Sequence, residues 1–482
     1  MLDIIFYSAF VSVLIYSIIE SAKFIENINI FAVGRRNFST FSLTMTIVAT
    51  WVSGSGFFIN LTQFYKSGLF YLIPAIFMCF SLLFVSLFIA KRMKPYLGFS
   101  SVAAIMGHSY GHKIRVITAI AGAVGVMGLI AVQFKIFASL GSYIWGEYNI
   151  NPSWYVIFFG SIITLYSSFG GVQSVVKTDI IQAVCFFISI IIAIVVLYLK
   201  VDSIPQEILS KVDVSKFHIK SIFQSESDKI WNFILLCVYF LIPGMNPASI
   251  QRLTMGFHVD QLRSSWFISF LLLLIVKLTC AYIVYLLYLT NPNLQESQLF
   301  PTLINSFEID GVKAILIIGI ISMAMSTADS FLNISAVLIA NDTYAYKQSS
   351  VKKLSIARKW SFIIGLSAII LTFFKNDLLS LLLFANSFYI PIVTVPLLAL
   401  IFNFKLTERC VIFSMATSFI FVCVCHFIIH VSFEPIMPAM LLNAVVLFTS
   451  HYIIEKWELL SSFGITSNLY KMRKPIKKDF YE

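Results

Sequence analysis

Charged residues are scarce in this chain. Only 12% of its 482 residues are Asp, Glu, Lys or Arg, whereas 59% are hydrophobic and the mean hydropathy is +0.89. A soluble domain carries roughly 25% charged residues. The composition therefore excludes a soluble protein over most of the length and indicates an integral membrane protein.

The signatures of several functional classes are also missing. The seven cysteines lie in or beside apolar stretches with no paired spacing, which argues against a disulfide framework or a zinc site. His108 and His112, like His426 and His430, have the spacing of metal ligands but no third ligand beside them in the sequence. The sequence has no phosphate-binding loop, nucleophile elbow or paired catalytic carboxylates. We therefore expect neither an ATP-driven pump nor an enzyme.

Long apolar stretches fill most of the chain. A membrane-spanning helix needs roughly 20 apolar residues. We count thirteen candidates, at about 4–19, 40–65, 69–91, 115–145, 153–168, 178–199, 230–250, 264–289, 312–340, 358–375, 378–402, 408–430 and 436–454. The first follows no positively charged segment and precedes no cleavage site, so it is not a signal peptide. The prediction is an all-α membrane protein with one transmembrane domain over 1–482.

Basic residues lie mostly on one side of these spans. Of the 34 Lys and Arg residues, the majority fall in alternate loops and in the tail at 455–482. The positive-inside rule then places the amino terminus outside and the carboxyl terminus in the cytoplasm. We expect a multi-pass protein of the cell membrane, in a bacterium the inner membrane. The net charge of +11 is the basic rim of a protein in a lipid bilayer, and nucleic acid is not expected as a partner.

Two of the spans are interrupted midway. The second reads ATWVSGSGFF (49–58), and the seventh reads LIPGMNPASIQR (241–252). Glycine and proline free backbone groups that neighbours or a polar cavity must satisfy. Because five spans separate the breaks, they enter the membrane from opposite sides, which is typical of inverted repeats with a central site. Spans 2–6 and 7–11 would form the repeats, at about 40–199 and 230–402, with spans 4–19, 408–430 and 436–454 peripheral.

A polar stripe follows the ninth span. Ser322, Ser326, Asp329 and Asn333 are spaced to share one helix face, and Thr327 lies beside them. A single hydroxyl often bonds back to its own helix, but an intramembrane Asp faces protein or water. The adjacent hydroxyls and the freed carbonyls of the second span are neutral oxygens. They suit a monovalent cation such as Na⁺, because a divalent ion would want more carboxylates.

Two lysines also lie within spans. Lys135, in IAVQFKIFASL, is central in the fourth span, where a lysine costs about 2.5–3.5 kcal/mol on insertion scales. It could point into the cavity and meet a substrate carboxylate or a neighbouring acid, or it could snorkel or form a structural ion pair. Lys277 in the eighth span is a weaker case of the same kind.

Four motifs in order resemble the sodium/solute symporter family. They are FAVGRRN (31–37), YSSFGGVQSVVKTDIIQ (166–182), QR (251–252) and ISMAMSTADSFLNISAVLIANDTY (321–344). The resemblance implies a LeuT-type core of five plus five helices in inverted repeat, with broken helices in spans 2 and 7. It also implies a Na⁺ site made from Ala49, Val52, Met323, Ser326 and Thr327.

The resemblance implies further site residues. Asp179 matches an acidic position on the inner sodium path, with a helix cap as its alternative role, and Asp329 is a second candidate for the ion path. The solute would lie across the two breaks, near Ser53, Gly54, Ser55, Lys135, Tyr239, Pro243, Asn246 and Pro247. Trp51 stands where the proline carriers of the family have an aspartate, which argues against proline itself.

These features together predict Na⁺-coupled symport of a small organic solute by alternating access. An amino acid or a carboxylate is favoured because of the cavity lysine, and the single visible cation site suggests 1:1 coupling. Two alternatives remain open at this point. One is a transporter-like sensor that binds solute without accumulating it, suggested by the resemblance of the QFK segment to carrier modules of sensor kinases. The other is proton coupling through Asp329 or the region of Lys135.

Overall fold

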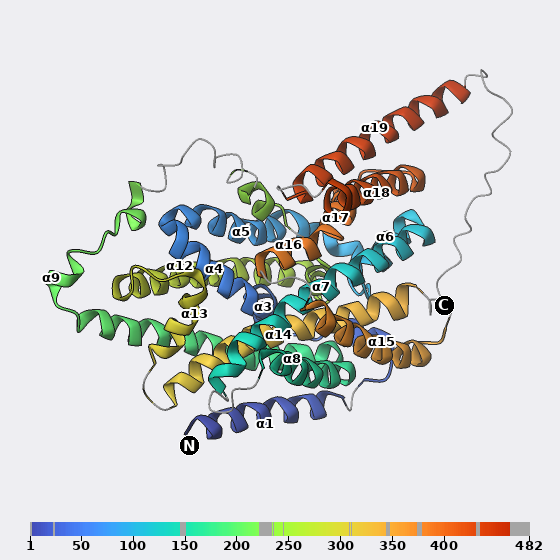
Figure 1. Cartoon of the computed structure of the whole chain (residues 1–482). Helices are drawn as coiled ribbons and strands as arrows, with labels where there is room; N and C mark the ends of the chain where they lie inside the picture. The colour runs from blue at the N-terminus through green and yellow to red at the C-terminus, as the bar shows by residue number, and fades with distance from the viewer. Residues whose placement is uncertain are drawn as a thin grey trace.

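The computed structural model is built from helices. It describes residues 2–22, 25–144, 151–220, 234, 236–243, 245–307, 309, 311–343, 348–373, 378–429 and 434–462, and within these ranges it contains no strand. The helices run at several inclinations around a shared centre (Figure 1).

The helix bounds follow the apolar stretches of the sequence. The α-helices are α1 (Leu2–Ala22), α2 (Ile28–Val33), α3 (Thr40–Trp51), α4 (Gly54–Ser67), α5 (Leu72–Phe84), α6 (Val102–Tyr110), α7 (His112–Ile144), α8 (Pro152–Asp202), α9 (Gln206–Leu209), α11 (Pro247–Thr254), α12 (Val259–Thr290), α13 (Glu296–Asn305), α14 (Val312–Asp342), α15 (Ser350–Leu371), α16 (Leu378–Ser387), α17 (Ile390–Ile401), α18 (Glu408–Cys423) and α19 (Ile436–Ser462). Short 3₁₀ or π segments are η1 (Gly68–Tyr71), η2 (Val85–Ile89), η3 (Ala90–Tyr96), η5 (Ser215–Phe217) and η7 (Val424–Ile429).

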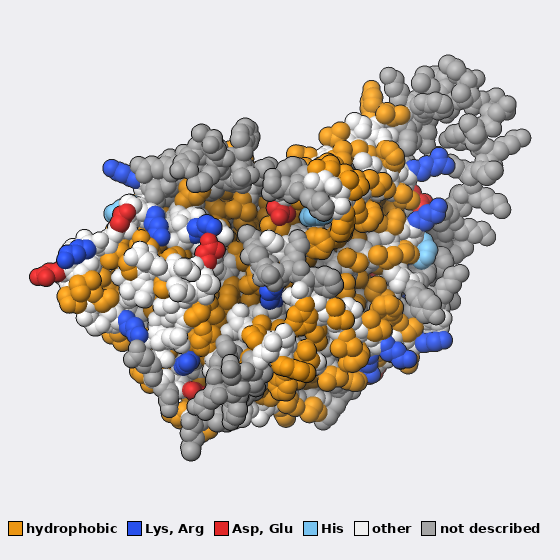
Figure 2. All heavy atoms as spheres, viewed as in Figure 1, with side chains coloured by type: hydrophobic (Ala, Val, Ile, Leu, Met, Phe, Trp, Pro, Cys, Tyr) orange, Lys and Arg blue, Asp and Glu red, His pale blue; other side chains and the backbone are white. Residues whose placement is uncertain are grey.

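These helices form a multi-pass membrane protein. Within the described ranges, eight helical segments are long and apolar enough to cross a membrane, or up to nine if the bent pair α16 and α17 is one span. Figure 2 shows apolar side chains over much of the surface, with Lys and Arg mainly toward its two ends. The count of thirteen spans stays a prediction.

Helix α8 contains two of the expected spans. Its 51 residues would extend for about 77 Å at 1.5 Å per residue, more than twice the hydrocarbon thickness of a bilayer. Gly171 interrupts it with a φ of +56°, a left-handed conformation that favours glycine. The expected spans at 153–168 and 178–199 lie on either side of this glycine.

Helix α14 is the buried centre of the molecule. It packs against α8, α7, α15 and α3, and most of its side chains are inaccessible to solvent. Its polar stripe therefore faces other helices and not lipid. Close helix contact depends on small residues: a Cβ added to Gly319 would lie 2.2 Å from the Cβ of Ser189 on α8. The glycines of α7 serve the same purpose, since a Cβ on Gly128 would lie 2.5 Å from the Cβ of Ala385.

Candidate ion and solute site

The first break lies between α3 and α4. Helix α3 ends at Trp51, Val52 has non-helical dihedrals, and Ser53 caps α4 by accepting a hydrogen bond from the amide of Gly56 at 2.9 Å. A Cβ added to Gly54 would lie only 2.8 Å from the Cβ of Ala324. The sequence SGSG thus both interrupts the helix and allows its backbone to approach α14.

Four of the five oxygens expected around Na⁺ converge at this break. The hydroxyl of Ser326 donates to the carbonyls of Ala49 at 2.9 Å and Met323 at 3.1 Å. The hydroxyl of Thr327 lies 3.1 Å from the Met323 carbonyl and 3.5 Å from the carbonyl of Ala49. It also lies 3.5 Å from the carbonyl of Thr50, which was not in the expected set. Val52, the fifth expected ligand, is buried at the adjacent end of α3. The cluster is a set of neutral oxygens, as a monovalent cation prefers.

The remaining groups of the stripe contact different helices. Tyr166 and Ser167 of α8 donate hydrogen bonds to the two carboxylate oxygens of Asp329, at 2.7 and 2.6 Å. Further along, the amide of Asn333 donates to the carbonyl of Phe31 at 3.2 Å. Asp329 is thus held by α8, away from the four oxygens of the break.

A buried ion pair lies one helical turn from the cation cluster. Arg252 of α11 lies 3.5 Å from a carboxylate oxygen of Asp179, and Thr46 donates a hydrogen bond to the same oxygen. The guanidinium also donates to the hydroxyls of Ser330 and Thr50. Asp179 lies inside α8 and not at a helix start, so the alternative of a helix cap is wrong. The sequence analysis named Arg252 only as part of the QR motif and did not predict its pairing with Asp179.

The second break lies before α11. A short helical stretch ends at Leu241, Asn246 caps α11 by accepting from the amide of Ser249 at 2.8 Å, and Pro247 opens the helix. Gly244, also expected here, is outside the described residues. At this break Pro247 starts the helix, and the side chain of Asn246 accepts a hydrogen bond from a backbone N–H that the helix leaves unpaired.

A central cavity of about 180 Å³ lies between the two breaks. Thr50, Trp51, Ser53 and Ser55 line it from the first break, and Asn246 lines it from the second. Further lining residues come from surrounding helices, namely Gln133, Tyr239, Lys277, Phe331 and Asn386. Thr327 belongs both to this lining and to the cation cluster, so the two sites are adjacent.

Four of the eight solute candidates named from the sequence line the central cavity, and four do not. Ser53, Ser55, Tyr239 and Asn246 belong to its lining. The others, within the part of the chain that the structure describes, are absent from that lining: Gly54, Lys135, Pro243 and Pro247. Gly54 packs on α14, and Pro247 lies against Gly122 of α7.

Lys135 does not face the central cavity, because its position on α7 directs its side chain toward α15. Its ammonium lies 3.5 Å from the carbonyl of Thr372, at the end of α15. Gln133, two residues earlier on α7, faces the cavity and exchanges hydrogen bonds with Ser55, at 2.7 Å to its hydroxyl and 3.2 Å from its amide. Residues two apart on a helix lie about 200° around the axis from one another, so both cannot face the same cavity. Gln133 was not predicted from the sequence, because an amide within a span indicates a functional site less strongly than a charged side chain does.

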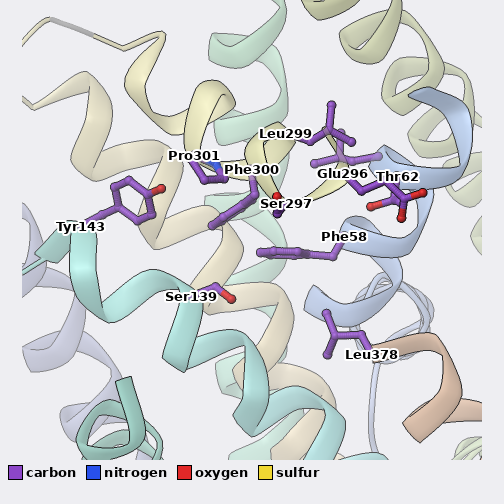
Figure 3. Close-up of a pocket in the computed structure, with 11 residues that line it drawn as sticks. Phe58, Thr62, Ser139, Tyr143, Glu296, Ser297, Leu299, Phe300, Pro301 and Leu378 are labelled. Atoms are coloured by element: carbon purple, nitrogen blue, oxygen red, sulfur yellow. The ribbon is translucent and has the colours of Figure 1, made fainter. Parts of the chain in front are cut away.

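A second hollow continues along the same helices. It has a volume of about 360 Å³ and lies between α4, α7, α13 and α16 (Figure 3). Phe58 and Phe300 meet at its centre with ring centroids 3.9 Å apart. On α7 its lining residues Ser139 and Tyr143 follow Gln133 of the central cavity in sequence. We call this the Phe58–Phe300 hollow.

The comparisons with known proteins agree with this architecture. The model of the sodium:solute symporter family matches residues 31–417. The sodium/sialic acid symporter NanT of Aliivibrio fischeri is 23% identical over 238 residues, which are 46% of this chain and 47% of that relative. The match therefore spans about half of the relative's length. A solved structure of a Na⁺-coupled sialic acid symporter, substrate-bound and outward-open, superposes with a TM-score of 0.79 at 14% identity, covering 94% of this chain and 97% of the other. That similarity confirms the expected LeuT-type, all-helical fold.

Proposed function

Because the chain belongs to the sodium:solute symporter family, we propose that it couples the entry of Na⁺ to the uptake of a small organic solute by alternating access. One observation supports this most directly: Thr327 is shared by the cation cluster and the central cavity. A cation held there would join α14 to the unwound end of α3. The same contact would shape the wall of the solute cavity.

Coupling follows from this shared wall. Na⁺ would be bound by the hydroxyls of Ser326 and Thr327 and the carbonyls of Ala49, Val52 and Met323. Each hydroxyl now donates to a carbonyl, and rotating its hydrogen away would direct its lone pairs at the ion. Binding would favour the conformation in which the break approaches α14. Solute affinity rises in that conformation, and by reciprocity solute raises the affinity for Na⁺.

The proposed path runs from the Phe58–Phe300 hollow through the central cavity to the ion pair of Arg252 and Asp179. The solute enters past Phe58 and Phe300 and stops between the two breaks, near Ser53, Ser55, Tyr239 and Asn246. Na⁺ leaves past Asp179, whose second carboxylate oxygen has no hydrogen-bond partner among the described residues. With the amino terminus outside, this direction is inward.

The driving force of one ion is sufficient for accumulation. One charge moving through 100 mV supplies about 2.3 kcal/mol. At 1.4 kcal/mol per tenfold ratio, this supports a solute gradient of roughly fifty-fold. We propose 1:1 coupling, since the described oxygens form one cluster of this kind.

The solute class we propose is a small carboxylate or amino acid. The two relatives are named for sialic acid, which is itself a carboxylic acid. The central cavity offers amide and hydroxyl groups for a polar body, from Gln133, Tyr239 and Asn386.

Uptake into proteoliposomes tests the proposal. Labelled N-acetylneuraminate, L-proline and pantothenate would be offered under an imposed Na⁺ gradient, with K⁺ as the control cation. Ser326→Ala/Thr327→Ala should reduce accumulation to the K⁺ level. Ser335→Ala is the matched control, because this buried hydroxyl of α14 bonds only back to its own helix, to the carbonyl of Leu332 at 2.9 Å.

The other outcomes separate the alternatives. Solute that binds but never accumulates would favour a sensor. Accumulation that follows a pH gradient and ignores Na⁺ would favour proton coupling through Asp329. Na⁺-driven uptake that survives the double substitution would refute the assigned cation site.

A further inference from the structure

Lys277 is a buried lysine in the middle of α12. Its side chain is 4% exposed, and it lines the central cavity. Among the described residues, no hydrogen bond or ion pair to its ammonium is found. An unpaired charge inside a membrane protein is costly and is retained where a ligand or a water-filled cavity compensates it.

The charge of Lys277 is not balanced within the cavity. The described lining residues include serines, threonines, amides and aromatics, but no Asp or Glu. The buried carboxylates Asp179 and Asp329 already have other partners. Asp179 pairs with Arg252, and Asp329 accepts hydrogen bonds from Tyr166 and Ser167. An anion among the contents of the cavity would compensate this charge.

Two more polar groups face the same space without a described partner. Asn60 of α4 is 5% exposed and Tyr71 of η1 is 6% exposed, and both line the cavity. Neither side chain has a hydrogen bond to another described residue. Both α4 and η1 pack against α12, the helix that carries Lys277.

Four other polar residues of the lining are hydrogen-bonded in pairs. Gln133 bonds to Ser55, and the amide of Asn386 donates to the hydroxyl of Tyr239 at 3.2 Å. Lys277, Asn60 and Tyr71 thus keep their hydrogen-bonding capacity for the contents of the cavity. An ammonium, a phenol and a primary amide are all donors, and a carboxylate is an acceptor with several lone pairs.

We propose that Lys277 binds the carboxylate of the transported solute, with Asn60 and Tyr71 donating hydrogen bonds beside it. This inference rests on the proposed function, in that the central cavity is the solute site. It makes the negative charge of the solute a condition for tight binding, since only that charge compensates the ammonium. It also assigns the role to Lys277 in place of Lys135.

The test compares each acid with the carboxamide in which a neutral group replaces its carboxylate. The probes are N-acetylneuraminate, L-proline and pantothenate, each paired with its amide. Binding is measured as thermal stabilisation of the purified full chain, in NaCl and in KCl. The wild type should prefer at least one acid over its amide. Lys277→Met should weaken binding of that acid by on the order of tenfold to hundredfold, the range for a lost charge-assisted hydrogen bond, and leave the amide nearly unaffected.

Three further variants make the result specific. Lys135→Met removes a lysine from the other side of α7 and should keep the acid preference. Lys277→Arg keeps the positive charge and should retain a preference for the acid. Lys277→Gln provides a second neutral variant should the methionine variant fold poorly.

Several results would overturn the inference. These are an acid preference that persists in Lys277→Met and Lys277→Gln, a wild type that binds only the carboxamides, and a wild type that binds none of the acids. Failure of the proposed function looks different. Acid binding that depends on Lys277 but ignores Na⁺ would support this inference and count against sodium coupling.

Discussion

The ion pair between Arg252 and Asp179 allows a quantitative prediction. Its nitrogen and oxygen are 3.5 Å apart, and the two side chains are 1% and 0% exposed. At an effective dielectric constant of about 20, two unit charges at this separation attract by about 5 kcal/mol. Desolvation of both charges offsets much of this attraction, so the pair itself adds little net stability. Removing only one partner is different, because the other charge is then buried alone.

We therefore expect strong non-additivity. Asp179→Asn keeps an acceptor for Thr46 but isolates the guanidinium, and should lower the free energy of unfolding by about 3–5 kcal/mol. Arg252→Met isolates the carboxylate and should have a similar effect. The double variant removes both charges and should lose much less than the sum of the two. A coupling energy of about 2–4 kcal/mol is expected.

Unfolding titrations of the purified protein in mixed detergent micelles would measure this cycle. The control is Lys66→Ala, which removes a shorter ion pair to Glu296 (2.9 Å) whose side chains are 63% and 58% exposed. That loss should stay below about 1 kcal/mol, because water screens the pair. Single losses that add to within about 0.5 kcal/mol would show that the two buried charges do not interact, and would refute the reasoning.

Two other predictions concern the contacts of α14. Gly54→Ala places a methyl group 2.8 Å from the Cβ of Ala324, so the break should move away from α14. The Na⁺ concentration for half-maximal uptake should rise by roughly tenfold, and an unchanged value would contradict the close approach. Tyr166→Phe removes one of the hydrogen bonds to Asp329 and should lower the free energy of unfolding by about 1.5–3 kcal/mol in the same titrations. A loss under about 0.5 kcal/mol would mean that the carboxylate finds another donor.

Part of the site could be predicted from the sequence, because it is formed by residues that are close together in the chain. Ser326 and Thr327 are adjacent, so any helix presents their hydroxyls on one turn, and Ser53 of SGSG can cap a new helix after α3 ends. The polar stripe was likewise a property of one helix. Its burial could be expected, since lipid does not solvate a carboxylate.

Other parts of the site depend on contacts between distant segments. The pairing of Arg252 with Asp179 joins residues 73 positions apart in the sequence (252 − 179), and no local pattern specifies it. Gln133 and Tyr71 were missed for the same reason. Each is an ordinary residue for a membrane helix until the neighbouring helices place it at the cavity.

The two lysines show where sequence and structure divide. The sequence by itself determined that the chain spans a membrane, and it predicted two interrupted spans and the positions of Lys135 and Lys277 inside apolar stretches. These follow from composition and from the local preferences of glycine, proline and charge. Only the tertiary structure decided which lysine lines the central cavity, because that depends on how α7 and α12 are rotated about their axes. Packing against neighbouring helices sets that rotation, and a single helix with apolar residues on all sides does not encode it.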